Sequence, residues 1–219
     1  PLPFGNRGDP GGQREEGSPL IRIKICGITR LEDALLAEAL GTFAVGFVFA
    51  PGSRRRVDLE VARTISEALG PFVVRVGVFQ NQGPEEVLRL AEQARLQVVQ
   101  LHGQEPPEWA EAIGKHFPVI KAFPLTGPAD PGWAQYPAGT LLLDSKAPGS
   151  GQTYPRDWAK PLLQTGKRII LAGGITPENL EEVLALRPYA IDLASGVERA
   201  PGVKDEAKLR LLFAKAKGL

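Results

Sequence analysis

A lysine and the only cysteine of the chain stand close together in one short apolar stretch, IRIKICGITR, at residues 21–30. Because side chains alternate between the two faces of a β-strand, the isoleucines share one face, and Lys24 and Cys26 share the other. An ammonium group lowers the pKa of a neighbouring thiol and so increases the fraction of thiolate, which is a general base. We therefore expect Lys24 to support Cys26 as a base. The competing interpretation is a structural ion pair of Lys24 beside a small buried cysteine.

Asp144 is the acid that could work with Cys26. It directly follows an apolar run at 141–143 and opens a long polar loop, DSKAPGSGQTY, which ends at Tyr154. Long loops after a strand are uncommon and are often functional, for example as lids. An aspartate at the end of a strand can also merely cap a turn. If Asp144 and Cys26 meet at the same edge of a sheet, they can serve as an acid and base pair.

Two glycine-containing segments have the composition of phosphate-binding loops. They are LAGGITPENL, with Gly173 and Gly174, and DLASGVERAPGVKD, with Ser195 and Gly196. Small residues leave backbone N–H groups exposed just before a helical turn, where a phosphate accepts hydrogen bonds from them. A single Gly-Gly pair is a weak signal, but two such loops after the last two strands of a barrel are a strong one. We expect a phosphorylated small-molecule substrate.

Three further polar positions are candidates for substrate binding. Arginines occupy 54–56, after the second apolar run, and one of them could bind a carboxylate of the ligand through two hydrogen bonds, although such runs are usually solvated. His102, in QLHG, is either a turn residue or a polar contact in the site. Asp192 lies in the last apolar run and is the expected partner of the Lys24 ammonium, which is costly to bury alone.

These candidates belong to a regular alternation of apolar runs and helical windows. Eight runs predict strands, at 21–26, 44–49, 72–78, 98–101, 119–122, 141–143, 168–171 and 190–193. Helical windows lie between them, at 31–40, 58–69, 85–94, 108–115, 158–164, 179–186 and 206–217, with a weak one near Trp133. This count predicts a (β/α)₈ barrel, whose sites form at the C-terminal strand ends. A doubly wound sheet is the alternative, but its first turn would need more glycine than CGITR has.

The bulk composition bears on domain number and on the partner. With 219 residues, of which 43% are hydrophobic, the chain suits a single globular domain. Residues 1–19 are rich in glycine and proline without periodicity, so we expect a flexible extension there and the barrel at 20–219. Twenty-six basic and 25 acidic residues leave a formal charge of +1, which gives no reason to expect nucleic acid or an anionic membrane as partner.

The cellular compartment follows from three features of the sequence. No apolar run approaches the ~20 residues that span a bilayer. The first residues lack the apolar segment of a signal peptide. One cysteine cannot form an internal disulfide and fits a reducing compartment. We therefore expect a cytoplasmic protein.

Taken in order, seven segments resemble the phosphoribosylanthranilate isomerase family of tryptophan biosynthesis: KICGITR, GFVFAPGSRRRV, RVGVF, QLHG, LLLDSKAPGSGQTYPRDW, LAGGITPENL and SGVERAPGVKD. They cover essentially the whole chain after the N-terminal extension. The resemblance implies a (β/α)₈ barrel that performs an Amadori rearrangement on a ribose 5-phosphate joined through C1 to the amine of anthranilate. Ala194 is a departure, because similar sequences often have serine there, and the loop GSGQTY is less rich in glycine than many.

The same resemblance implies roles for individual residues. Cys26 corresponds to the general base, Asp144 to the general acid, and Arg55 to the residue that holds the anthranilate carboxylate. The loops with Gly173, Gly174, Ser195 and Gly196 correspond to the phosphate site. We expect no metal and no organic cofactor, and a monomer or homodimer.

Two alternatives to this function remain open at the level of the sequence. A related sugar isomerase of histidine biosynthesis performs the same rearrangement on a substrate with two phosphates. It is expected to have two aspartates instead of the cysteine, and a second phosphate site in the first half of the barrel. A non-catalytic phosphate-binding barrel would keep the glycine loops but would not need Cys26 and Asp144 together.

Overall fold

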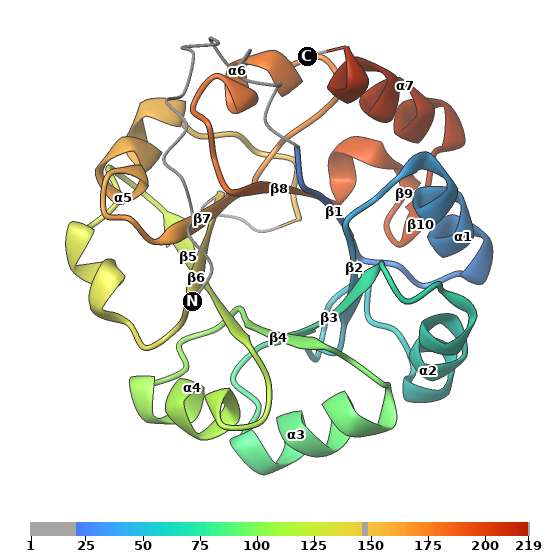
Figure 1. The fold of residues 1–219 in the computed structure, drawn as a ribbon, viewed down its shortest axis with the longest axis horizontal. Helices are drawn as coiled ribbons and strands as arrows, with labels where there is room; N and C mark the ends of the chain where they lie inside the picture. Colours follow the sequence, from blue (N-terminus) through green and yellow to red (C-terminus); the bar gives the residue numbers. More distant parts are fainter. Residues whose placement is uncertain (1–20, 146–148, 219) are drawn as a thin grey trace, which may run out of the picture.

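The computed structural model describes residues 21–145 and 149–218. Eight parallel strands form a closed barrel in sequence order (Figure 1). It closes where the first strand pairs with the eighth, with Lys24 beside Asp192. The strands are β1 (Ile23–Cys26), β2 (Ala44–Val48), β3 (Val74–Phe79), β4 (Val98–Leu101), β5 (Val119–Leu125), β6 (Thr140–Ser145), β7 (Arg168–Leu171) and β8 (Ala190–Leu193). The predicted (β/α)₈ barrel is confirmed, and the doubly wound sheet is excluded.

Helical segments surround the barrel and connect the strands (Figure 1). The α-helices are α1 (Leu31–Leu40), α2 (Leu59–Ala68), α3 (Pro84–Gln93), α4 (Pro107–Gly114), α5 (Lys160–Leu163), α6 (Leu180–Leu184) and α7 (Glu206–Lys217). Three segments are 3₁₀-helices: η1 (Pro131–Gln135), η2 (Arg156–Ala159) and η3 (Ser195–Val197). A short hairpin of β9 (Glu198–Ala200) and β10 (Val203–Lys204) precedes α7.

The crossover between β5 and β6 contains a 3₁₀ turn instead of an α-helix. Asp130 caps this turn by accepting a hydrogen bond from the Gly132 N–H at 2.8 Å. Trp133 stacks on Phe123 of β5, with 4.5 Å between the ring centroids. The contact covers the outside of β5 with one aromatic side chain, so the connection does not need a full helix there. The weak helical pattern near Trp133 thus corresponds to a five-residue 3₁₀-helix.

Apolar side chains fill two layers, one on each side of the barrel wall. Ile23 and Ile25 belong to the outer layer between the strands and the helices, as their spacing predicted. A smaller cluster fills the inside of the barrel, and it includes Val76, Ile120 and Leu142. The second layer closes the barrel below its C-terminal mouth, as in other barrels of this type. The polar residues at the C-terminal strand ends therefore lie directly above this packed apolar layer.

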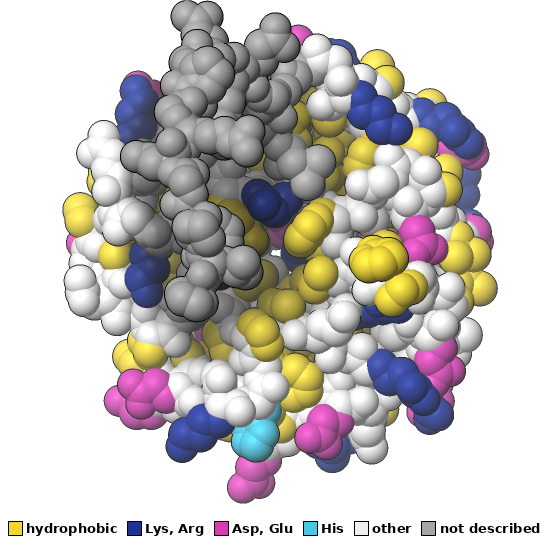
Figure 2. Space-filling view, viewed as in Figure 1, with side chains coloured by type: hydrophobic (Ala, Val, Ile, Leu, Met, Phe, Trp, Pro, Cys, Tyr) yellow, Lys and Arg dark blue, Asp and Glu magenta, His cyan; other side chains and the backbone are white. Residues whose placement is uncertain are grey.

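The N-terminal extension predicted at 1–19 lies outside the described residues, so the domain boundary at residue 20 stays a prediction. No helix in the described ranges is both long enough and apolar enough to cross a lipid bilayer. On the face shown in Figure 2, side chains of both charge signs are interspersed over the surrounding helices. Hydrophobic side chains are visible both near the centre of that face and along its rim.

Candidate active site

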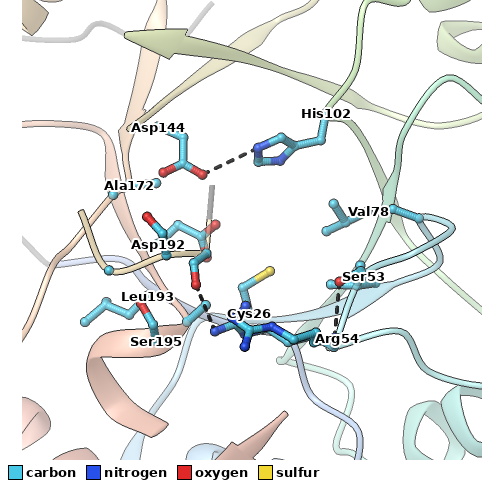
Figure 3. Close-up of a pocket in the computed structure, with 18 of the residues that line it drawn as sticks. Cys26, Ser53, Arg54, Val78, His102, Asp144, Ala172, Asp192, Leu193 and Ser195 are labelled. Carbon is cyan, nitrogen blue, oxygen red and sulfur yellow. Dashed lines mark hydrogen bonds and ion pairs between the residues drawn. The ribbon is translucent and has the colours of Figure 1, made fainter. Parts of the chain in front are cut away.

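A cavity of about 490 Å³ opens at the C-terminal ends of the strands (Figure 3). Its volume falls within the range of about 300–1,000 Å³ that is usual for small-molecule sites. All the predicted site residues except Lys24 line it, namely Cys26, Arg55, His102, Asp144, Gly173, Gly174, Asp192, Ser195 and Gly196. Residues from six of the eight βα units therefore meet in one place, as the barrel interpretation required.

Cys26 is the last residue of β1, and its thiol lines the cavity although the residue is only 9% exposed. Gly46 is its neighbour on β2. A Cβ atom at Gly46 would lie 2.7 Å from the Cys26 Sγ and 3.2 Å from the Lys24 Cε. Glycine is therefore needed here because any side chain would displace the thiol and the lysine.

Lys24 lies below Cys26, inside the barrel. Its Nζ donates hydrogen bonds to Asp192 Oδ2 and Gln100 Oε1, each at 3.0 Å. The pairing expected between Lys24 and Asp192 is thus confirmed. Burial disfavours the ammonium, but the charges of Asp192 and Cys26 outweigh burial, and the pKa of Lys24 is raised. Asp192 Oδ1 is buried without a hydrogen-bond partner among the described residues, although Asp192 lines the cavity.

The expectation that Lys24 gives Cys26 a lowered pKa is wrong in its net direction. Burial of the thiol is the largest influence, and it raises the pKa of Cys26 above its ordinary value. Lys24 acts in the expected direction, as does Lys204, but the two ammonium groups only reduce the rise. Asp192 adds to the rise because its negative charge disfavours a neighbouring thiolate. Lys24 therefore limits the cost of ionising Cys26 instead of making the thiol acidic.

Asp144 and His102 point toward one another across the mouth of the barrel (Figure 3). His102 Nε2 lies 3.4 Å from Asp144 Oδ2. The other oxygen, Oδ1, accepts a hydrogen bond from the N–H of Ser145 at 2.7 Å. Asp144 is 7% exposed and faces the same cavity as Cys26. His102 is therefore a polar contact within the site and not simply a turn residue.

The two glycine loops lie side by side at the cavity wall. Gly173 and Gly174 have φ angles of 81° and 61°, which residues with a side chain rarely adopt. A Cβ atom at Gly173 would also lie 2.7 Å from the backbone nitrogen of Ser145. Ser195 and Gly196 begin η3 on the next unit and line the same cavity. Both predicted phosphate loops thus border one space.

Arg156 supports the first of these loops from behind. Its guanidinium donates hydrogen bonds to the carbonyls of Ala172 at 3.4 Å and Gly173 at 3.0 Å. The ring of Tyr154 lies against it, with 4.7 Å between the ring centroid and the guanidinium carbon. Arg156 is 7% exposed, and no carboxylate of the described residues forms a salt bridge with it. A buried positive charge therefore lies next to the predicted phosphate site.

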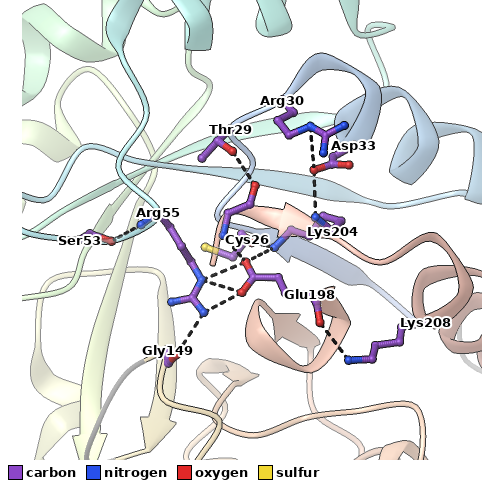
Figure 4. A network of polar contacts seen from close by, with 11 residues as sticks. Cys26, Thr29, Arg30, Asp33, Ser53, Arg55, Gly149, Glu198, Lys204 and Lys208 are labelled. Carbon is purple, nitrogen blue, oxygen red and sulfur yellow. Dashed lines mark hydrogen bonds and ion pairs between the residues drawn. The ribbon is translucent and has the colours of Figure 1, made fainter. Parts of the chain in front are cut away.

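Arg55 is the buried member of the arginine run, while Arg54 and Arg56 are exposed. Its guanidinium forms a two-pronged ion pair with Glu198 at the start of β9 (Figure 4). It also donates a hydrogen bond to the carbonyl of Gly149 at 3.2 Å. Lys204 pairs with the same carboxylate at 2.9 Å, and both Lys204 and Arg55 contribute to lowering the pKa of Glu198 against the effect of burial.

Sequence reasoning assigned no role to three residues in or beside this site: Gln100, Arg156 and Glu198. Gln100 had a usable signal, since it alternates with His102 in QLHG and a buried polar side chain in an apolar strand is informative. Glu198 comes from a hairpin too short and too polar to be predicted as strands. Nothing in the sequence around Arg156 distinguishes it from a surface arginine.

Comparison with known proteins agrees with this geometry. The family model described as N-(5'phosphoribosyl)anthranilate (PRA) isomerase matches residues 23–215. The N-(5'-phosphoribosyl)anthranilate isomerase of Thermotoga maritima is 44% identical over 205 residues, which are 91% of this chain and the whole of that protein. The similarity therefore extends over most of this chain and over the full length of that isomerase.

Solved structures extend the likeness to the fold. The phosphoribosyl anthranilate isomerase from Thermus thermophilus is 76% identical with a TM-score of 0.90, over 90% of this chain and 99% of that one. A second such isomerase, in complex with reduced 1-(o-carboxyphenylamino)-1-deoxyribulose 5-phosphate, is 40% identical with a TM-score of 0.82, over 91% of this chain and all of the other. The chain belongs to the N-(5'-phosphoribosyl)anthranilate isomerase family.

Proposed function

We propose that this protein is an N-(5'-phosphoribosyl)anthranilate isomerase. It converts N-(5-phosphoribosyl)anthranilate to 1-(2-carboxyphenylamino)-1-deoxyribulose 5-phosphate, an Amadori rearrangement in tryptophan biosynthesis. The observation that carries the proposal is that Cys26, Asp144 and both glycine loops line one cavity. The family relative crystallised with a reduced form of this product supports it.

The residue types match the steps that the rearrangement requires. Asp144, in its protonated form, gives its proton to the furanose ring oxygen, and the C1–O bond breaks to leave an iminium. The iminium makes the proton on C2 more acidic, and the Cys26 thiolate removes it to give an enolamine. Tautomerisation of the enolamine yields the 1-amino-1-deoxyketose. The substrate's own nitrogen supplies the electron pair that forms the C=N bond as the C1–O bond breaks, and it accepts a pair again when C2 loses its proton, so the reaction needs neither a metal nor an organic cofactor.

Binding of the substrate divides between the two sides of the cavity. We assign the phosphate to the loops of Gly173, Gly174, Ser195 and Gly196, whose small side chains leave backbone donors accessible. Arg55 is assigned to the anthranilate carboxylate because it is the buried arginine of its run and lines the cavity. Asp192 is assigned to a hydroxyl of the sugar, and His102 to the same side of the cavity, beside Asp144, where the sugar ring oxygen has to lie.

Asp192 can serve the sugar because its Oδ1 is a buried acceptor without a partner among the described residues. A hydroxyl group of the ribose would satisfy it, which removes the cost of an unpaired buried oxygen. Lys24 is assigned a supporting role, since it holds Asp192 from below and its charge favours the Cys26 thiolate.

The proposal extends to partners and location. The partner is a phosphorylated small molecule and not nucleic acid or a membrane, which agrees with the formal charge of +1. We propose a cytoplasmic monomer or homodimer, because the pathway is biosynthetic and Cys26 is a free thiol. The family match gives no support to the isomerase of histidine biosynthesis or to a non-catalytic barrel.

Turnover tests the proposal directly. Phosphoribosylanthranilate is generated in situ, and its fluorescence is followed with the wild type, Cys26→Ser and Asp144→Asn. Both variants are expected to lose at least ~10²-fold in kcat/KM, as for a general base and a general acid. Asp157→Asn is the matched control, because Asp157 is an exposed aspartate that pairs only with Lys160 among the described residues. A folded wild type without turnover would contradict the proposal.

A further inference from the structure

A network of polar contacts crosses the inside of the barrel from Lys24 to Asp144, with two hydrogen bonds followed by an ion-pair contact. Lys24 Nζ donates to Gln100 Oε1 at 3.0 Å, and Gln100 Nε2 lies 2.9 Å from His102 Nδ1. His102 Nε2 in turn lies 3.4 Å from Asp144 Oδ2. Lys24 and Gln100 are 3% and 1% exposed, so water has little access to these two side chains. The network joins the lysine beside the base to the carboxyl group of the acid.

Lys24 determines which group donates and which accepts at each contact of this network. An ammonium group only donates, so Lys24 must face the oxygen of the Gln100 amide and not its NH₂ group. The NH₂ group is then directed at His102 Nδ1, which has to accept. In a neutral imidazole one nitrogen accepts and the other carries the proton. His102 therefore carries its proton on Nε2, the nitrogen that faces Asp144.

We propose that Gln100 is a positioning residue that holds His102 in the neutral Nε2–H tautomer. The proposal deepens the proposed function, because the group that His102 then serves is the assigned general acid. With this tautomer, the Nε2 proton of His102 faces Asp144 Oδ2 at 3.4 Å, while Oδ1 accepts a hydrogen bond from the Ser145 N–H. The carboxyl plane is thus held from both sides, and the acid stays aimed into the cavity.

The opposite tautomer, with the proton on Nδ1, would disrupt this network at two contacts. A proton on Nδ1 would face the NH₂ group of Gln100, and the bare Nε2 would face the oxygen of Asp144. Rotation of the Gln100 amide would repair the first contact but would turn its NH₂ group toward Lys24.

The charged groups around His102 are consistent with the Nε2–H tautomer. Asp144 faces it from β6, and Lys24 reaches it only through Gln100. Glu105 and Lys121, near the following turn, are paired with each other at 2.6 Å. Since Lys121 and the N–H groups of Gly103 and Asn81 already donate to Glu105, that carboxylate is engaged elsewhere.

Imidazole ¹⁵N NMR tests the tautomer without reference to catalysis. The chain has two histidines, so histidine-labelled protein gives His102 and one internal reference, His116, which is exposed. In the wild type at neutral pH, His102 is expected to show an unprotonated Nδ1 and a protonated Nε2. His116 serves as the reference because no side-chain hydrogen bond fixes its tautomer among the described residues.

Two substitutions then test the role of Gln100. Gln100→Met removes the donor at nearly constant size, and the His102 signals are expected to move toward the pattern of His116. Gln100→Glu replaces the donor by an acceptor, and His102 is expected to become protonated on Nδ1. Gln97→Met is the matched control, because Gln97 is an exposed glutamine whose amide oxygen accepts from the Arg75 N–H. It should leave the signals of His102 unchanged.

Kinetics connect the tautomer to the reaction. Gln100→Met is expected to lower kcat by about tenfold, the effect of one lost hydrogen bond, with KM nearly unchanged. A protonated Nδ1 in the wild type, or a wild-type pattern retained in folded Gln100→Met, would overturn the proposal. The wild-type spectrum decides the tautomer even if a variant fails to fold. It also separates the two proposals, since the tautomer can be correct in a protein that does not turn over this substrate.

Discussion

Arg55 and Glu198 form a buried ion pair in which Arg55 Nη2 lies 2.7 Å from Glu198 Oε2 and Nε lies 3.0 Å from both carboxylate oxygens. The residue assigned to the substrate carboxylate therefore already has a carboxylate partner. Glu198 takes up the Nε side of the guanidinium and fixes its plane. The Nη1 group lies toward Gly149, and both Arg55 and Gly149 line the cavity.

Replacement of Arg55 by lysine is expected to weaken substrate binding. Lysine keeps the charge but loses the planar fork, so it cannot bind Glu198 and a second carboxylate in fixed directions. We expect KM to rise by about tenfold or more, the scale of one hydrogen bond to a charged group, with a smaller effect on kcat. Arg56→Lys, the same change at the exposed neighbour, should leave both constants unchanged. Equal effects of the two substitutions would remove Arg55 from the site.

The barrel could be predicted from the sequence because hydrophobic residues form short continuous runs in its buried strands but recur every three to four residues in its amphipathic helices. The runs at 98–101, 168–171 and 190–193 match β4, β7 and β8 residue for residue. The run predicted at 119–122 is shorter than β5, which continues through Pro124 to Leu125. A proline interrupts an apolar pattern, but here it lies near the strand end, where it is tolerated.

The site was only partly predictable. The prediction that Lys24 and Cys26 face the inside of the barrel was correct, because the face that a strand residue occupies depends only on the two-residue alternation of side chains. The net pKa shift of Cys26 could not be predicted, since it depends on how deeply the thiol is buried. Nor could the partner of Arg55, because Glu198 lies 143 positions away and belongs to a hairpin without an apolar pattern.

The ionisation of Cys26 makes a prediction about pH. Because burial raises the pKa of this thiol, activity that depends on the thiolate should increase with pH up to at least about 8.5, the ordinary value. Lys24→Met removes a charge that lowers the pKa, so the rise should move to higher pH. The rate of alkylation of Cys26 by iodoacetamide measures the same ionisation, and the chain has no second cysteine to interfere.

Lys115→Met is the matched control for this experiment. Lys115 is exposed at the end of α4, away from the strand ends that form the cavity. Its removal changes the net charge equally, so a general electrostatic effect would shift both pH profiles. An unchanged alkylation profile in Lys24→Met would show that Lys24 does not influence the thiol.

Arg156 is expected to contribute to phosphate affinity although it does not line the cavity. Its charge lies behind the Gly173 carbonyl and has no carboxylate in a salt bridge among the described residues, so a bound dianion would be its main counter-charge. Arg156→Met should raise KM, and the inhibition constant of inorganic phosphate, by about tenfold. Arg89→Met, which removes an exposed arginine on α3, should change neither. A change in kcat alone would contradict this role.

Glu105 should stabilise the fold in a pH-dependent way. Burial disfavours its carboxylate, but Lys121 and the backbone N–H groups that donate to it prevail, and the pKa of Glu105 is lowered. A lowered pKa in the folded state gives stability that is complete above the unfolded value of about 4.3 and is lost as the pH falls through the folded value. Glu105→Gln leaves Lys121 buried without its partner, which costs about 3–5 kcal/mol at neutral pH.

Urea unfolding at several pH values measures this loss. The difference between the wild type and Glu105→Gln should be largest at pH 7 and should narrow below about pH 4, because the wild type then protonates the same carboxylate. Glu206→Gln disrupts the exposed pair with Arg210 and should cost at most about 0.5 kcal/mol. If the loss for Glu105→Gln were as small as for Glu206→Gln, or independent of pH, the buried pair would not be a source of stability. Its function would then be limited to holding the turn at Gly103, next to His102.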